Sequence, residues 1–176
     1  TAPEDAYGLT KLEAEEALKT SCAKSGLELV IIRPPLIFSP HAKGNIAALV
    51  KAIRYKIPLP LASIRNQRDV LSLDNLCSLI TLCLSHPNAT RKEWLASDGA
   101  PLSTADMIRL LATAHALKAN LFSVPLKALA LLAKLTRKED ALQKLSGNLE
   151  VDSTLTRECL GWQPASTVEL IHQRPD

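Results

Sequence analysis

The sequence predicts an α/β fold: the closing portion of a doubly wound parallel sheet, followed by a mostly helical region with short strands. The first observation is a run of residues at helical spacing from Tyr7 to Ser25, followed by Gly26, a residue type that commonly ends helices. The second is the continuous apolar run 29–32, which suits a central strand that is covered on both faces. A helix, a glycine and a buried strand in this order are typical of a doubly wound sheet.

The character of the sequence changes after Pro40, so we divide the chain into residues 1–40 and residues 41–176. Apolar stripes and short apolar runs in the second region predict helices around 46–53, 76–84, 107–114, 126–135 and 155–160, and strands at 94–97 and 121–124. Asp74 is predicted to cap the second of these helices, and Ser103 with Asp106 resembles a capping box for the third. The second region is too irregular for another complete α/β domain.

The predicted helix 126–135 is unusually apolar. Its leucines nearly encircle the helix, at positions Leu129, Leu131, Leu132 and Leu135. A helix that is apolar all round is either buried or packed on a partner. The sequence therefore allows a homodimer through this helix.

Composition excludes several function classes. The 176 residues carry a formal charge of +3, and no run of Lys and Arg exceeds two, so we expect no nucleic-acid partner. No segment reaches the 18 or so apolar residues of a membrane span. The four histidines are scattered without ligand spacing, so we expect no metal. The four cysteines show no C-x-x-C pattern and are expected to be buried free thiols in a reducing compartment, the cytoplasm.

Tyr7 and Lys11 are the residues that best suit chemistry. They stand four residues apart on the first predicted helix, and this spacing places both on one face. A nearby ammonium favours the phenolate and lowers the pKa of a tyrosine, so the pair could transfer protons. The alternative is a Tyr–Lys contact on a solvated helix.

Several motifs follow one another in an order that is known from one protein family. They are Tyr7-Gly8-Leu9-Thr10-Lys11 with Glu15, Arg33-Pro34-Pro35-Leu36-Ile37-Phe38-Ser39-Pro40, Gly44-Asn45, Arg68-Asp69-Val70 and Leu160-Gly161-Trp162-Gln163-Pro164. As a set they resemble the extended branch of the short-chain dehydrogenase/reductase superfamily, in particular its NAD-dependent nucleotide-sugar epimerases and dehydratases. The resemblance covers essentially the whole chain. It implies a Rossmann-type sheet, with residues 1–40 as the last helix and strand of the dinucleotide-binding domain and residues 41–176 as the substrate-binding subdomain.

The resemblance also implies roles on the cofactor side. Tyr7 would move a proton at a sugar hydroxyl as hydride moves to or from the nicotinamide of NAD or NADP. Lys11 would lower the pKa of Tyr7 and hold the nicotinamide ribose. Arg33 and Pro34 are expected in the cofactor site.

On the substrate side, the resemblance implies that Asn45 and Arg68 bind a nucleotide-diphosphate sugar, because an arginine fork suits phosphate geometry. Asn45 could instead cap the helix that starts at Ile46, and Arg68 could form a surface ion pair. The asparagine that the family carries after the strand is Leu36 here. This variant points weakly to 4-ketoreductases of bacterial surface-polysaccharide synthesis.

The glycine-rich dinucleotide motif of the family, G-x-x-G-x-x-G, does not occur in the chain. We therefore expect a C-terminal, truncated part of an epimerase or dehydratase, inactive by itself. The alternatives are a part of a nucleotide-sugar ketoreductase and a non-catalytic module that binds a nucleotide sugar or a partner.

Overall fold

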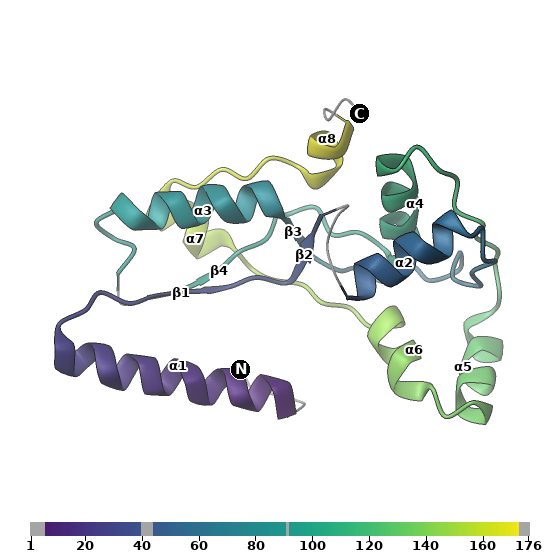
Figure 1. Cartoon of the computed structure of the whole chain (residues 1–176), viewed down its shortest axis with the longest axis horizontal. Coiled ribbons are helices and arrows are strands. Elements are labelled where there is room, and N and C mark those ends of the chain that lie inside the picture. Colours follow the sequence, from purple (N-terminus) through teal and green to yellow (C-terminus); the bar gives the residue numbers. More distant parts are fainter. Residues whose placement is uncertain (1–5, 40–43, 91, 173–176) are drawn as a thin grey trace.

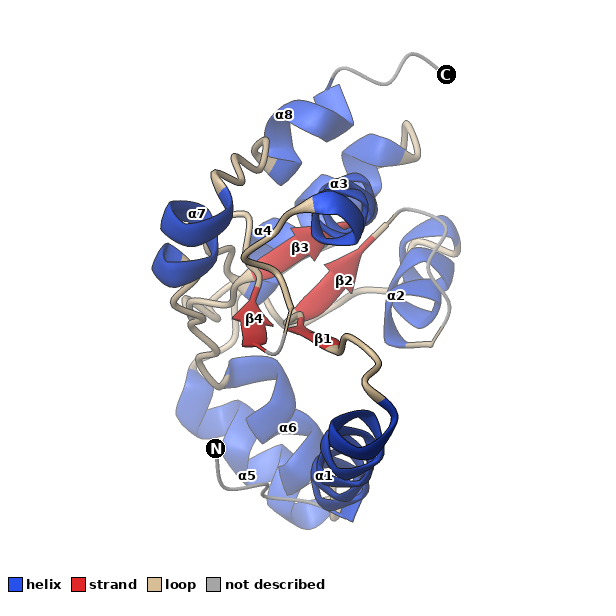
Figure 2. Ribbon diagram, turned by 90° about the vertical axis from the view of Figure 1, so that its left-hand side faces the viewer, coloured by secondary structure: helices blue, strands red, loops and turns tan. Residues whose placement is uncertain are grey.

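Short parallel strands form the central layer of the computed structural model, which describes residues 6–39, 44–90 and 92–172. Helices α3, α7 and α8 lie on one side of the strands, and α1 lies on the other (Figures 1 and 2). Helices α2 and α4 stand beside the strands, and α5 and α6 form a hairpin below them in Figure 1. The fold is therefore mixed α/β with small parallel sheets, as the sequence predicts.

The strands form two parallel pairs. Their bounds are β1 (Val30–Arg33) with β4 (Lys92–Leu95), and β2 (Leu36–Phe38) with β3 (Val70–Ser72). The predicted strands 29–32 and 94–97 correspond to β1 and β4 with small shifts. Strands β2 and β3 are not predicted from the sequence, because each has only three residues.

Strand β1 is not buried on both faces in this chain. All four of its residues are half-buried, and among the described residues its ladder partner is β4 alone. The expectation of a central strand covered on both faces is therefore wrong within the described part, since β1 has a strand on one edge only and its residues are half-buried.

Helix α1 (Ala6–Ser25) agrees with the first predicted stripe. Gly26 follows it with φ +73°, and its N–H donates to the carbonyl of Cys22, so the glycine ends the helix as expected. The division of the chain after residue 40 falls outside the described residues and stays a prediction.

The rest of the chain is mainly helical. The helices are α2 (Asn45–Arg54), α3 (Leu73–Ser85), α4 (Thr104–Ala114), α5 (Leu126–Leu135), α6 (Glu139–Ser146), α7 (Thr154–Leu160) and α8 (Thr167–His172). All five predicted helices of this region are present. The helix over 155–160 is not the last, because α8 follows it.

Two local predictions of caps have different outcomes. Ser103 caps α4 as predicted, since its hydroxyl accepts the N–H of Asp106. Asp74 does not cap α3, because Ser72 is the N-cap and accepts the N–H of Asn75 at 3.1 Å.

The strand predicted at 121–124 is not formed. Leu121 makes one isolated bridge, to Leu59.

The buried side chains form two apolar clusters. One joins β2, α2 and α4 through Phe38, Ile46, Val50, Ile53, Ile108 and Leu111. The other joins β3, α3, β4 and α7 through Leu71, Leu79, Trp94, Leu160 and Trp162, and Val30 and Ile32 of β1 pack against it. Segments from both predicted regions thus share the core around β1.

Some predicted burial is absent. In α5 only Leu129 and Ala133 are buried, whereas Leu131, Leu132 and Leu135 are more than half exposed. The prediction that this helix is buried on all sides is therefore wrong within this chain.

Of the four free cysteines only Cys83 is buried, so the expectation that all four are buried is wrong. Burial raises the pKa of the Cys83 thiol. Within the described part, no helix has the length and apolarity to cross a bilayer.

Candidate functional site

Helix α1 runs antiparallel to β1. Glu15, in the middle of α1, contacts Arg33, the last residue of β1. Lys19, one turn later, contacts Glu93 of β4, which is paired with Ile31. The C-terminal half of α1 thus lies beside the beginning of the strands. The N-terminal end of α1 points toward the carboxyl ends of the strands (Figure 1). That edge is where ligands bind in open parallel sheets.

Tyr7 and Lys11 both fall in the first half of α1, four residues apart in continuous helix. This spacing keeps both positions on one helix face, as the sequence predicts. Lys11 is exposed. The helix therefore carries the predicted pair at the end of the sheet where a ligand would bind, and the proton-transfer role of the pair stays a prediction.

Arg33 lies between two carboxylates. Its Nε donates to Glu15 Oε1 at 3.0 Å, its Nη2 pairs with the other oxygen of Glu15, and its Nη1 lies 2.8 Å from Glu93 Oε2. All three guanidinium nitrogens are thus engaged within the protein. Pro34, which the sequence places in the cofactor site with Arg33, is exposed after the strand.

The Arg33–Glu15 contact favours the charged form of both side chains. The hydrogen bond from Arg33 holds the pKa of Glu15 below its ordinary value, while partial burial acts in the opposite direction and the charges of Arg33 and Lys19 add to the lowering. The same hydrogen bond raises the pKa of Arg33. Both side chains are therefore charged at neutral pH.

Asn45 is the first residue of α2 and is exposed. The N-cap of α2 is Gly44, with φ +70°, a backbone conformation that favours glycine. The alternative in which Asn45 itself caps the helix is therefore wrong. Its predicted substrate contact stays open to test.

Arg68 is half-buried just before β3. Its Nη1 donates to the carbonyls of Lys144 at 2.8 Å and Gly147 at 3.0 Å, at the end of α6. Asn66 donates to the carbonyls of Leu145 and Gly147 in the same turn. The positive side chain thus satisfies carbonyls at the negative end of the α6 dipole, and the predicted surface ion pair is replaced by these contacts.

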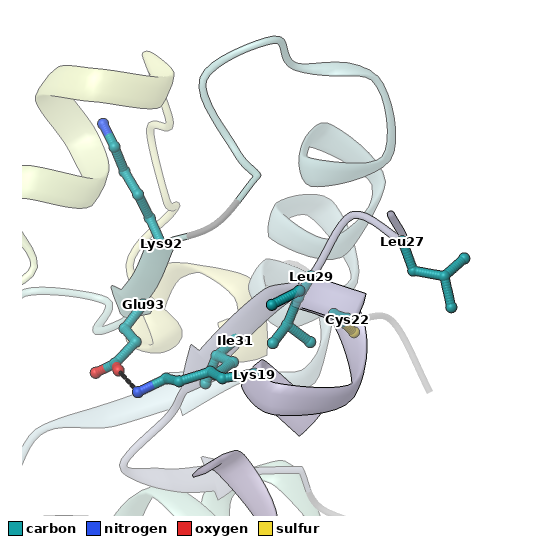
Figure 3. Close-up of a pocket in the computed structure, with 8 residues that line it drawn as sticks. Lys19, Cys22, Leu27, Leu29, Ile31, Lys92 and Glu93 are labelled. Carbon is teal, nitrogen blue, oxygen red and sulfur yellow. Dashed lines mark ion pairs between the residues drawn. The ribbon is translucent and has the colours of Figure 1, made fainter. Parts of the chain in front are cut away.

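A pocket of about 370 Å³ lies between the second half of α1 and the β1–β4 pair (Figure 3). Its lining is mostly apolar, with the Lys19–Glu93 ion pair at one side: Lys19, Cys22, Ala23, Leu27, Leu29, Ile31, Lys92 and Glu93. None of the predicted site residues lines it. The pocket is therefore separate from the predicted catalytic end of α1.

In the residues that the structure describes, no group of His, Cys, Asp or Glu side chains could hold a metal ion.

The ion pairs from Glu15 and Lys19 to Arg33 and Glu93 are not predicted from the sequence. A signal was present, since Glu15 and Lys19 continue the four-residue spacing of Tyr7 and Lys11.

Comparison with known proteins gives one family. Residues 1–95 match the NAD dependent epimerase/dehydratase family. A UDP-glucose 4-epimerase of Vibrio cholerae is 43% identical over 169 residues, which are 96% of this chain and 52% of that protein. The chain spans about half the length of the curated relatives that it matches.

Solved structures with the same fold are more distant in sequence. An epimerase of Methanothermobacter thermautotrophicus has a TM-score of 0.73 at 14% identity, with 98% of this chain and 49% of that chain covered. A UDP-N-acetylglucosamine 4-epimerase of Bacillus cereus has a TM-score of 0.70 at 18% identity, with coverage of 99% and 56%. These structures establish a likeness in fold to Rossmann-type epimerases.

Proposed function

Because this chain belongs to the NAD-dependent epimerase/dehydratase family, we propose that it is the substrate-binding, C-terminal part of an enzyme that acts on nucleotide-diphosphate sugars. The observation that carries the proposal is the position of α1. Its Tyr7–Lys11 segment lies toward the carboxyl ends of the parallel strands, in the same chain as the region that would bind the substrate.

The proposed division assigns residues 1–40 to the dinucleotide-binding domain and residues 41–176 to substrate binding. Two facts support the wider proposal that the phosphate-binding part of the enzyme is not in this chain. The match covers about half of the relatives' length, and the six glycines of the chain contain no G-x-x-G-x-x-G spacing. The phosphate-binding turn of the family would then belong to the other half of the complete protein, and these 176 residues would not turn over substrate alone.

In the proposed mechanism, Tyr7 takes a proton from a sugar hydroxyl or returns one to it. A base close to its working pKa is efficient in such a step. Lys11, four residues on, lowers the pKa of Tyr7 because its ammonium stabilises the phenolate.

The residues present fit one end of the cofactor. Lys11 is exposed on the helix face of Tyr7, where it could hold the nicotinamide ribose, but no glycine-rich turn is present for the pyrophosphate. NAD or NADP, held by the complete protein, supplies hydride acceptance and donation at the sugar carbon. Arg33 offers no nitrogen that lacks a carboxylate partner.

Asn45 and Arg68 are proposed to bind the sugar nucleotide. Asn45 is exposed at the start of α2, where backbone N–H groups and the helix dipole favour an anion. Arg68 uses only Nη1 for its two carbonyl contacts, so its guanidinium retains donors for a diphosphate.

A second candidate is a nucleotide-sugar 4-ketoreductase. Leu36 replaces the family asparagine at the start of β2 and packs against the first apolar cluster, so it makes no polar substrate contact there. We also assign the complete protein to the cytoplasm. A homodimer, if it forms, would use the exposed leucines of α5, which are Leu126, Leu131, Leu132 and Leu135.

The test is to incubate the complete protein with a panel of nucleotide sugars and either NAD(H) or NADP(H), to separate the products by chromatography against sugar-nucleotide standards, and to measure the mass of each. An isomer of unchanged mass supports an epimerase, loss of water a dehydratase, and gain of two hydrogens a ketoreductase. Binding of a nucleotide sugar without any product would leave the non-catalytic module and contradict the proposal.

A further inference from the structure

Five charged side chains from three elements form a continuous network. Arg33 of β1 joins Glu15 of α1 to Glu93 of β4 through the contacts given above. Lys19 of α1 extends the network, since its Nζ lies 2.7 Å from Glu93 Oε1 (Figure 3) and 2.9 Å from Glu16 Oε1. Both oxygens of Glu15 and of Glu93 are therefore engaged, and two positions of α1 are tied to two neighbouring strands.

The network lies on the helix stripe that carries the predicted catalytic pair. Tyr7, Lys11, Glu15 and Lys19 follow one another at intervals of four residues. Each step of four residues turns about 40° around the axis, so Glu15 lies about 40° and 6 Å from Lys11 and about 80° and 12 Å from Tyr7. Whatever fixes Glu15 and Lys19 thus fixes how the beginning of α1 is rotated.

Apolar packing does little to hold α1. No residue of α1 whose side chain the structure describes is buried, and the pocket of about 370 Å³ opens between its second half and the strands. The Lys19 and Glu93 side chains are 38% and 34% exposed. The Arg33–Glu15 pair is better covered, with 18% of the Glu15 and 26% of the Arg33 side chain exposed. Ion pairs at this level of exposure are screened less than those at the surface.

We propose that Arg33 is a positioning residue that, with Glu15 and Glu93, fixes the rotation and axial position of α1 for catalysis, and that it makes no contact with the cofactor. The inference rests on the proposed function. It also replaces the cofactor role that the sequence suggests for Arg33.

The geometry requires arginine at this position. Two nitrogens of a planar guanidinium grip both oxygens of Glu15, while the third reaches Glu93. A lysine offers one charge centre on a flexible stem, so it can keep the attraction but not the fixed orientation. An effect of Arg33→Lys on turnover would thus report geometry more than charge.

The test compares Arg33→Lys, Glu15→Gln and their double variant in the complete protein. Glu13→Gln is the matched control, because Glu13 is exposed on the same helix, two residues from Lys11 as well as from Glu15. The measurements are kcat and KM for the nucleotide sugar, the NAD dissociation constant by calorimetry, and the pH profile of kcat/KM.

We expect kcat to fall about 10- to 100-fold in each single variant, since small misplacement of catalytic groups has effects of this size. KM and NAD affinity should stay within about threefold, because the contacts with both ligands remain. The double variant should lose no more than the worse single variant, as expected for groups that act as a unit. The pKa of Tyr7 in the pH profile should stay at its wild-type value, because Tyr7 and Lys11 move together on one helix, and Glu13→Gln should match the wild type in every measurement.

Two results would overturn this inference and leave the proposed function standing. The first is wild-type kcat in both Arg33→Lys and Glu15→Gln. The second is a tenfold loss of NAD affinity in Arg33→Lys with kcat retained, which would make Arg33 a cofactor contact. If Arg33→Lys does not fold, Glu93→Gln preserves the Arg33–Glu15 fork and must still lower kcat with KM unchanged. A wild-type protein that turns over no nucleotide sugar would refute the proposed function, and the inference with it.

Discussion

Asp98 is a buried carboxylate that links three segments of the fold. It accepts the N–H of Ser72 at 3.0 Å, the side-chain amide of Asn75 at 2.7 Å and the hydroxyl of Thr167. These donors lie at the end of β3, in α3 and at the start of α8. Its hydrogen bonds therefore connect the strand layer to the helices above it.

We predict that Asp98→Ala lowers the free energy of unfolding by about 3 kcal/mol, because buried donors are left without an acceptor. Urea unfolding measures this, and Asp140→Ala, at an exposed position of α6, is the control with an expected change below about 0.5 kcal/mol. Equal effects of the two substitutions would show that the buried contacts do not stabilise the fold.

Glu15 gives the fold a dependence on pH at the acid side. The groups around it are Arg33 and Lys19, with Glu93 on the far side of Arg33 and Glu16 beside it in α1. Since the pKa of Glu15 is lower in the folded state than its ordinary value of 4.5, its contribution is present above that value and is lost as pH falls through the folded pKa.

We predict that the thermal midpoint of Glu15→Gln falls less than that of the wild type on acidification from neutral pH through 4.5, the ordinary pKa of this carboxyl. At neutral pH the variant should be less stable by about 1 kcal/mol, because the ion pair is only partly buried. Glu13→Gln should follow the wild-type curve. Parallel curves for the wild type and Glu15→Gln would contradict the contact.

At the scale of elements, α3 begins at Leu73, and its N-cap is Ser72 and not Asp74. The reason is that Ser72 both ends β3 and caps the helix, which leaves no loop between the two elements. Asp74 lies within the first helical turn, where a negative charge is mildly favourable.

Substitution of the two residues separates these roles. Ser72→Ala should lower the free energy of unfolding by about 1 kcal/mol, the usual effect of losing a cap. Asp74→Ala should cost less than about 0.5 kcal/mol. Chemical denaturation of both variants gives the comparison, and a larger loss from Asp74→Ala would place the functional cap back at Asp74.

Elements with strong local signals could be predicted from the sequence, and elements set by distant contacts could not. Helix α1 with Gly26, and α4 with its Ser103 cap, follow from residues within the same segment. Strands β2 and β3 exist because they pair with each other across the sequence, from Leu36 to Val70, and neither has a periodic pattern of its own. The run 121–124 looks like a strand locally, but it forms one isolated bridge, to Leu59, and scattered hydrogen bonds from Ala62 and Ser63 in place of a ladder.

The same distinction applies to the candidate site. The Tyr7–Lys11 spacing is local and survives in the structure, whereas the partners of Arg33 and Arg68 come from distant segments. Residue type and motif order gave Arg33 a cofactor role, and only the fold brings Glu15 and Glu93 to its guanidinium.

At the scale of the whole molecule, the two apolar clusters do not follow a simple cut at residue 40. Val30 and Ile32 of β1 pack against the cluster around Trp94 and Trp162, far along the chain. The proposed substrate-binding region thus also completes the strand layer on which α1 rests. This arrangement couples the helix that carries Tyr7 to the region that would hold the sugar nucleotide.

The kcat of Tyr7→Phe in the complete protein tests the central claim most directly, with Tyr55→Phe as control, since Tyr55 is an exposed tyrosine just after α2. The account predicts that Tyr7→Phe lowers kcat on the nucleotide sugar by about 100-fold or more, the size of an acid/base contribution, with the fold and NAD affinity retained. Tyr55→Phe should retain wild-type turnover. A Tyr7→Phe enzyme within a few-fold of wild-type kcat would contradict the account.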